Sequence, residues 1–239
     1  MDFSAFVLAG VVPDLPDPSE DLSPVDALAY QVSATEDVTA IKEYATGLPL
    51  IATSSLEPDN QQDSEQTTCT LMQAARTDPV EAIEVEYGFV AADSPVLESL
   101  QDLPVDIIVS YWNRSETPDL DTLLSIVNSA RKYGDIVYIE TMAESPDDSL
   151  TMLAAIYEAA DMGVTIGGAC MGEIGRHARV AAPTYGSKLA YAPLDVEMNW
   201  TVPGQYSLQE LAELINEFEE PTPPVSLHKN ITNPMIRDN

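Results

Sequence analysis

The sequence predicts a (β/α)8 TIM barrel formed by a single domain. Short apolar runs alternate with helical patterns along the whole chain, and each of the eight runs is rich in Val, Ile, Ala and Tyr. Such runs are typical of strands buried on both faces of a parallel sheet. A doubly wound open sheet is the alternative. Neither of its nucleotide motifs occurs, because no G-x-G-x-x-G follows the first run and no G-x-x-x-x-G-K-[ST] is present anywhere.

Each expected strand is about five to nine residues long, as a strand in such a barrel should be. The strands are expected at 6–12, 27–33, 48–53, 82–87, 106–111, 136–142, 163–168 and 188–194. The first βα unit is irregular. Three prolines fall within residues 12–21, so the first helix should be short or missing.

Three expected helices carry clear end signals. Residues 119–131 have an acidic start and a basic end and are followed by Gly134. Residues 145–157 open with a Ser cap and Pro at the first helical position. Residues 207–218 open with a capping-box pattern. We therefore expect the barrel to span 1–220, with a proline-rich, extended tail at 221–239.

The composition excludes several function classes. The chain has 239 residues, a formal net charge of −30 and only 10 basic side chains. Binding to nucleic acid or to an anionic membrane needs a basic surface, so neither is expected. Two cysteines cannot form a disulfide framework, and no apolar run reaches membrane-spanning length. We expect a soluble cytoplasmic protein with an acidic surface. The charge favours a halophilic protein over an acidic mesophilic one.

Metal and nucleophile motifs are weak. The only histidines, His177 and His228, lack metal-ligand spacing to Cys69 or Cys170, so no metal or other cofactor is expected. Nothing in the sequence pairs a Ser or Cys nucleophile with a base.

The acidic strand ends are stronger candidates. Glu84, Glu86 and Glu140 lie where barrel strands end, and active sites of such barrels form at that face. For Glu86, lining the mouth and facing the helices or water are equally open.

Five segments together resemble type I 3-dehydroquinate dehydratase, the Schiff-base enzyme of the shikimate pathway. Residues 106–118 resemble that family's I-x-S-x-H-[DN]-F-x-x-T-P, and residues 134–142 resemble A-D-I-V-K-I-A-x-M. Residues 171–179 resemble M-G-E-I-G-R-H-T-R, while 191–193 and 202–205 resemble Y-A-x and A-P-G-Q. The resemblance is dense from about residue 80 to 220 and implies the same barrel fold.

The catalytic pair implied by this resemblance is absent. The family's Schiff-base lysine aligns with Tyr138, and its acid/base histidine aligns with Trp112. An iminium needs a primary amine, which tyrosine lacks. An indole does not shuttle protons near neutral pH. Lys132 and Lys188 precede their strands and so should lie at the opposite face.

The implied substrate clamp is partly altered. The family's strand-two pattern [EW]-x-R-x-D aligns with residues 29–33, which read Ala-Tyr-Gln-Val-Ser, and the arginine after strand three aligns near Ser55. The resemblance places Arg179 where the family binds the substrate carboxylate. The substrate-binding candidates that remain are Glu86, Arg179, Tyr191, Thr201 and Gln205.

Two classes of function follow. The first is a relative of the dehydratase that has lost its activity, a pseudoenzyme that binds a small anionic metabolite through Arg179 or has a structural or regulatory role. The second is an enzyme with imine-independent chemistry, in which Tyr138 is the acid and Glu86 or Glu140 the base. A still-active dehydratase is a third reading. The resemblance also implies a homodimer as one possible assembly.

Overall fold

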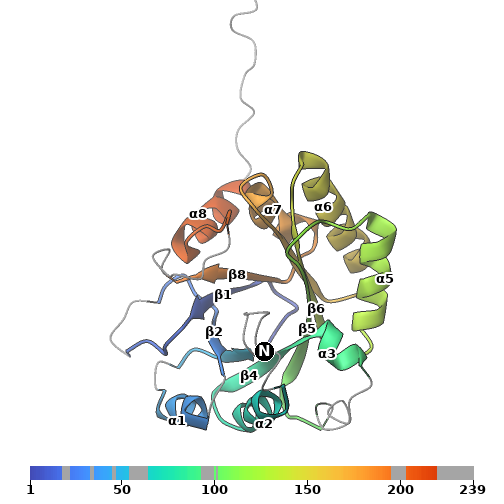
Figure 1. Ribbon diagram of the computed structural model, residues 1–239. Helices are drawn as coiled ribbons and strands as arrows, with labels where there is room; N and C mark the ends of the chain where they lie inside the picture. Colours follow the sequence, from blue (N-terminus) through green and yellow to red (C-terminus); the bar gives the residue numbers. More distant parts are fainter. Residues whose placement is uncertain are drawn as a thin grey trace, which may run out of the picture.

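The computed structural model shows a barrel of eight parallel strands with helices outside it (Figure 1). It describes residues 1–17, 22–32, 35–44, 47–53, 64–92, 100, 102–194 and 203–219. The strands are β1 (Val7–Val12), β2 (Ala27–Gln31), β3 (Leu50–Thr53), β4 (Val80–Glu86), β5 (Asp106–Asn113), β6 (Ile136–Met142), β7 (Ile166–Met171) and β8 (Leu189–Pro193). These strands confirm the eight that the sequence predicts.

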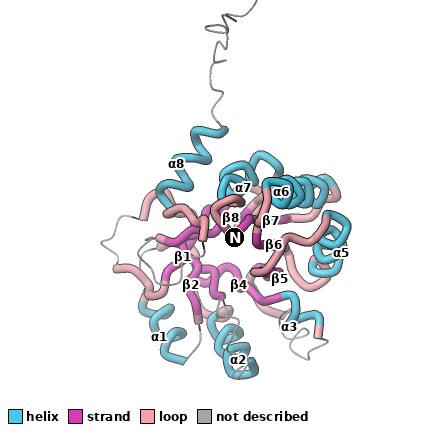
Figure 2. Tube along the Cα trace, turned by 45° about the horizontal axis from the view of Figure 1, so that its top comes forward, coloured by secondary structure: helices cyan, strands magenta, loops and turns pink. Residues whose placement is uncertain are grey.

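The strand order is β7-β6-β5-β4-β3-β2-β1-β8, and every neighbouring pair is parallel. The backbone N–H of Lys188 donates to the carbonyl of Ile166 at 2.7 Å, which joins the start of β8 to β7. The two edges of the sheet therefore meet, and the tube view shows the strands as a ring (Figure 2). The predicted TIM barrel is confirmed.

Helices cover the outside of the ring (Figure 2). They are α1 (Thr35–Glu43), α2 (Ser64–Ala74), α3 (Tyr87–Ala91), α5 (Leu120–Ala130), α6 (Pro146–Asp161), α7 (Arg176–Ala181), the 3-10 helix η2 (Ala182–Tyr185) and α8 (Leu208–Glu219). Between β1 and β2, the described residues 13–17 and 22–26 contain no helix, as the prolines predict. The tail at 221–239 lies outside the described residues.

The predicted helix ends hold in detail. Asp119 caps α5 by accepting a hydrogen bond from the backbone N–H of Thr122 at 2.8 Å. Ser145 and Asp148 form a capping box at the start of α6.

The strand expected at 163–168 instead runs from Ile166 to Met171. Gly163, with φ of +74°, ends the preceding helix, so the chain needs two more residues to reach the sheet.

Two apolar layers hold the barrel together. The larger lies between the strands and the helices, and the smaller fills the barrel interior. Phe3 enters the interior layer and packs with Val7, Ile136 and Leu189, which lie at or near the starts of their strands. The N-terminal segment therefore closes one end of the barrel, and Figure 2 shows the N-terminus within the ring of strands. Within the described residues, no helix combines the length and apolar character that crossing a membrane requires.

Candidate functional site

The carboxyl-terminal half of the barrel interior holds a buried polar cluster built on β6. Tyr138 and Glu140 are two residues apart, so both side chains point to the same face of the strand. The Tyr138 hydroxyl donates to Glu140 Oε2 at 3.1 Å, and the two residues are 0% and 1% exposed. Burial, and then the Glu140 carboxylate, raise the pKa of Tyr138 well above its usual value. The phenol is therefore a permanent donor to Glu140.

Arg179 completes this cluster from outside the strand ring. It lies on α7, and its Nη2 donates to Glu140 Oε1 in an ion pair that is 2% and 1% exposed. Burial alone would lower the pKa of Arg179, but Glu140 raises it. Both carboxylate oxygens of Glu140 thus have a donor, one from Tyr138 and one from Arg179.

Aromatic rings surround Tyr138. The Trp112 ring lies 5.9 Å away between centroids, and the Tyr191 ring lies 4.9 Å away in an edge-to-face arrangement. A Cβ atom added to Gly167 would lie 2.8 Å from Tyr138 Cδ2. Gly167 on β7 therefore leaves the space that the Tyr138 ring fills. The position that the resemblance assigns to a nucleophilic lysine is packed as part of the barrel core.

The structure separates the two glutamates of β4. Glu84 is 3% exposed and faces the interior, whereas Glu86 is exposed at the end of the strand. Burial raises the pKa of Glu84, while interactions with Tyr191 and Ser110 partly offset this effect. Glu86 precedes α3 as its N-cap residue and does not join the buried cluster. The strand pattern left the orientation of Glu86 open and the resemblance kept it as a binding candidate, but the residue beside Tyr191 and near Glu140 is Glu84.

Among the described residues of the buried cluster, two polar atoms have no hydrogen-bond partner. They are Arg179 Nε and the Tyr191 hydroxyl, both fully buried. The hydroxyl interacts with Glu84 electrostatically but without the geometry of a hydrogen bond. The cluster is therefore polar but incompletely satisfied, which is the condition under which a buried residue change has a large effect.

The remaining predicted residues lie at the rim or outside the described part of the chain. The backbone N–H of Gly172 donates to the carbonyl of Pro203 at 2.7 Å, which docks the 203–205 turn on the end of β7. Gln205 is half-buried in this turn. Thr201, Ser33 and Ser55 lie outside the described residues. Ala29 is buried and Gln31 is partly exposed at the end of β2.

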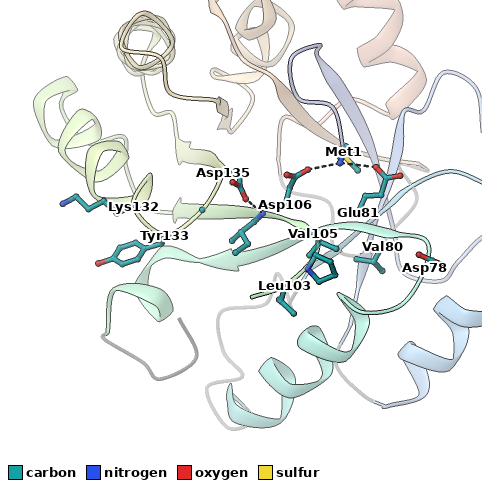
Figure 3. Close-up of a pocket in the computed structure, with 13 residues that line it drawn as sticks. Met1, Asp78, Val80, Glu81, Leu103, Val105, Asp106, Lys132, Tyr133 and Asp135 are labelled. Carbon is teal, nitrogen blue, oxygen red and sulfur yellow. Dashed lines mark hydrogen bonds and ion pairs between the residues drawn. The ribbon is translucent and has the colours of Figure 1, made fainter. Parts of the chain in front are cut away.

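A separate hollow of about 700 Å³ lies at the opposite end of the barrel (Figure 3). Residues at the starts of β4, β5 and β6 line it, together with Lys132 and the chain's amino terminus. The Met1 ammonium pairs with Asp106 Oδ2 at 2.8 Å and with Glu81 Oε2 at 3.2 Å. None of the predicted site residues lines this hollow. Barrel enzymes have their active sites at the carboxyl-terminal face, so we assign the residues at this opposite end to stability of the fold.

The described residues hold no group of three or more His, Cys, Asp or Glu side chains that could bind a metal ion. Cys170 is buried, and burial raises the pKa of its thiol to about 12, whereas Cys69 is exposed. His177 is exposed on α7, and its Nδ1 lies 3.0 Å from the Ile174 carbonyl oxygen. Within the described part of the chain, neither cysteine pairs with His177 in the manner of a nucleophile and its base.

Comparison with known proteins places this geometry among relatives. The family model described as type I 3-dehydroquinase matches residues 23–221. A protein of Haloarcula marismortui named 3-dehydroquinate dehydratase is 32% identical over 229 residues, covering 92% of this chain and 99% of the relative. A protein of the same name from Halobacterium salinarum is 28% identical, covering 92% of this chain and 100% of the relative.

Solved structures agree on the fold. The 3-dehydroquinate dehydratase of Geobacillus kaustophilus superposes with a TM-score of 0.75 at 20% identity, covering 90% of this chain and 91% of that one. The type I enzyme of Clostridium difficile, solved with covalently modified comenic acid, gives a TM-score of 0.73 at 20% identity, covering 90% and 92%.

Proposed function

This chain belongs to the type I 3-dehydroquinase family, and we propose that it is a pseudoenzyme that keeps the barrel without the family's Schiff-base chemistry. The observation that carries the proposal is Tyr138. It occupies the interior position that the resemblance assigns to the lysine, and its hydroxyl is committed to Glu140 at 3.1 Å. A phenol with a raised pKa offers neither the amine nor the nucleophile that an iminium requires.

The lysines in the described part of the chain do not replace the missing amine. Lys42 is exposed on α1, Lys132 lines the hollow at the opposite end of the barrel, and Lys188 Nζ donates to the Ser4 carbonyl at 2.8 Å. Covalent catalysis requires the amine within bonding distance of the substrate ketone. These three positions are therefore unsuited to the reaction.

The acid/base position supports the same proposal. Trp112 stands where the resemblance implies a histidine, and its ring packs against Tyr138. An indole N–H donates a hydrogen bond but does not exchange protons near neutral pH. Both members of the implied catalytic pair are replaced by mutually packed aromatic side chains, which favours a role in stability over one in proton transfer.

The proposed function is tested by trapping. Dehydratases that form an iminium become irreversibly labelled when borohydride reduces it, and the label appears as added mass. We expect no added mass when this protein is mixed with 3-dehydroquinate and borohydride in molar KCl. The Haloarcula marismortui relative, treated in the same way, is the positive control for the reagents. A substrate-dependent adduct on this protein would overturn the proposal.

A second candidate function is imine-independent acid/base chemistry, and Glu84 favours it. Burial raises the pKa of Glu84, so this carboxyl stays protonated to higher pH than usual, and a second carboxyl, Glu140, lies nearby in an ion pair with Arg179. A buried carboxyl with a raised pKa is a candidate general acid. If this function holds, turnover of 3-dehydroquinate without any borohydride adduct should be lost in Glu84→Gln. Turnover unaffected by that variant would remove Glu84 from the chemistry. The homodimer remains a prediction, and so does a small anionic ligand, although Arg179 is already paired with Glu140.

A further inference from the structure

Glu140 holds the guanidinium of Arg179 as a bound carboxylate ligand would. Its Oε1 accepts from Arg179 Nη2, its Oε2 accepts from the Tyr138 hydroxyl, and all three residues are at most 2% exposed. A buried arginine requires a buried anion, because an unpaired charge in the interior is strongly destabilising. In the described part of the chain, this anion comes from the protein itself.

Two departures from the family pattern form one unit. In the stretch that resembles A-D-I-V-K-I-A-x-M, Tyr138 stands at the lysine and Glu140 at the second alanine. Because side chains two residues apart share one face of a strand, the two new residues meet, and they do so through a hydrogen bond. Arg179, 39 positions from Glu140, matches the pattern and is the ion-pair partner of Glu140.

Among the described residues, no second cation competes with Arg179 for Glu140. The charged and titratable groups that act on Arg179 are Glu140, Tyr138 and Cys170, and Glu84 faces Glu140 from β4. Burial raises the pKa of Cys170 to about 12 and that of Tyr138 well above its usual value, so neither is an anion near neutral pH. Glu140 is therefore the group that balances Arg179.

We propose that Glu140 is a built-in carboxylate that occupies Arg179 and closes this site to carboxylate ligands, and that removing it opens a site for a small carboxylate. The inference deepens the proposed function and rests on it, since Schiff-base turnover of a carboxylate substrate would need Arg179 to be free. Glu140 is thus a specificity-determining residue, which selects against anions.

The side-chain fragment that a substitution of Glu140 removes determines which carboxylate should be used as the probe. Replacing glutamate by alanine removes a CH2–COO⁻ fragment, and acetate is the free molecule that matches it. In Glu140→Ala, acetate should fill the vacated volume and pair with Arg179, whose Nε also has no partner. Ligands that bind only the folded state raise its stability, so the melting temperature should rise with acetate concentration.

The experiment compares melting in KCl and in potassium acetate at equal ionic strength. We expect Glu140→Ala to melt on the order of 10 °C below wild type in KCl, because Arg179 is left unpaired. Replacing chloride by acetate should restore several degrees, saturating with acetate concentration, while the wild type shows no saturable shift. If Glu140→Ala fails to fold in KCl, refolding yield in acetate against chloride is the same readout.

Two matched controls separate the inference from general salt effects. Glu140→Gln keeps the shape of the side chain, so acetate finds no space and should give no saturable shift. The double variant Glu140→Leu with Arg179→Met removes both charges, so it should melt near wild type and ignore acetate. An equal acetate response in the wild type, or none in Glu140→Ala, would overturn the inference. The proposed function is overturned by a borohydride adduct or by turnover of 3-dehydroquinate, neither of which is read from the acetate experiment, so the two failures are distinguishable.

Discussion

The two halves of the barrel interior are built on different principles. In the amino-terminal half, Phe3, Val7, Ile136 and Leu189 pack as an apolar layer in which no side chain requires a specific partner. In the carboxyl-terminal half, Tyr138, Glu140 and Arg179 are equally buried but polar, and each depends on the next. The eight strands are the same in both halves. The two halves therefore differ in how far the substitution of one residue disturbs the residues that contact it.

This contrast explains why the departures from the family pattern occur together. In the apolar half, a change of similar volume is tolerated singly. In the polar half, a single change leaves a buried donor, acceptor or charge without its partner. Burial of Tyr138 and Glu140 is therefore favourable only when both are present together with Arg179. The polar half lies at the face where barrels of this class carry out their chemistry, and under the proposed function it is a second structural core.

The largest expected effect breaks the ion pair. Arg179→Met leaves Glu140 as an uncompensated buried charge, and we expect it to lower the free energy of unfolding by roughly 3 to 5 kcal/mol. Adding Glu140→Leu should recover most of this loss, since a well-packed apolar pair often matches a buried ion pair. Urea unfolding in molar KCl measures both. A double variant as unstable as the single would contradict the pairing.

The next effect concerns the apolar half. Ile136 is 1% exposed, so Ile136→Ala should lower the free energy of unfolding by about 2 to 5 kcal/mol through lost burial and a cavity. Leu150, at 64% exposure on α6, is the matched control, and Leu150→Ala should change stability by less than about 0.5 kcal/mol. Similar losses for both variants would mean that the interior layer is not packed as described.

A smaller effect sharpens the comparison within the polar half. Tyr138→Phe removes the donor to Glu140 and should cost roughly 1.5 to 3 kcal/mol, the range for a hydrogen bond to a charged group. Tyr191→Phe removes a hydroxyl that has no hydrogen-bond partner among the described residues. This variant should therefore lower the free energy of unfolding by less than Tyr138→Phe does. Thermal and urea unfolding of the two variants give the ranking, and the reverse order would show that the Tyr138 hydrogen bond is not the important one.

The pH dependence of stability should report Glu84. Its pKa is raised in the folded state by burial, so the folded protein holds this proton more tightly than the unfolded chain. The contribution of Glu84 to the free energy of unfolding is fully present below the pKa of this group in the unfolded chain, 4.5. It is lost as the pH rises through the pKa in the folded protein. Glu84→Gln removes that loss. We expect the variant to gain stability relative to wild type as pH rises from 4.5 toward neutrality, and a constant difference would refute the assignment.

The smallest effect needs no variant. Cys69 is exposed, while Cys170 is buried with its thiol pKa raised to about 12, so only the first should react with a thiol reagent in the folded state. We expect one modified thiol per chain under native conditions and two in denaturant, counted by mass spectrometry. Rapid native labelling of Cys170 would show that the β7–α6 layer opens.

The sequence predicted the barrel well because strand burial is a local property. Runs such as 7–12 are apolar over their whole length, and the capping signals at Ser145 and Ser207 mark helix starts without reference to the rest of the chain. The helix α2 was not predicted, since its Ser64–Ala74 segment is mostly polar and carries little periodic signal. Local patterns identify elements only where the pattern is strong.

The site was less predictable because it depends on long-range contacts. Tyr138 and Trp112 were found by position, but the packing of Tyr138 against both Trp112 and Tyr191 joins β5, β6 and β8. The ion pair between Glu140 and Arg179 spans 39 positions, and no local rule reports it. Its signal in the sequence was the glutamate standing where the family pattern has alanine.

Period-two alternation also set a limit. Glu84 and Glu86 share one face of β4, so alternation alone cannot tell which of them is buried. Depth decides this, because Glu84 lies inside the ring of strands and Glu86 lies at its end. How far inside the ring a residue lies depends on the register of its strand with the neighbouring strands. The sequence alone does not give this register.

The measurement that tests the central claim most directly is turnover of 3-dehydroquinate in molar KCl, followed by the absorbance of the enone product. The protein should first be shown to melt cooperatively, and the Haloarcula marismortui relative should be assayed beside it. The account predicts no turnover by this protein above the uncatalysed rate, because Tyr138 and Glu140 fill the catalytic position and occupy Arg179. Sustained turnover by the purified wild type would contradict it.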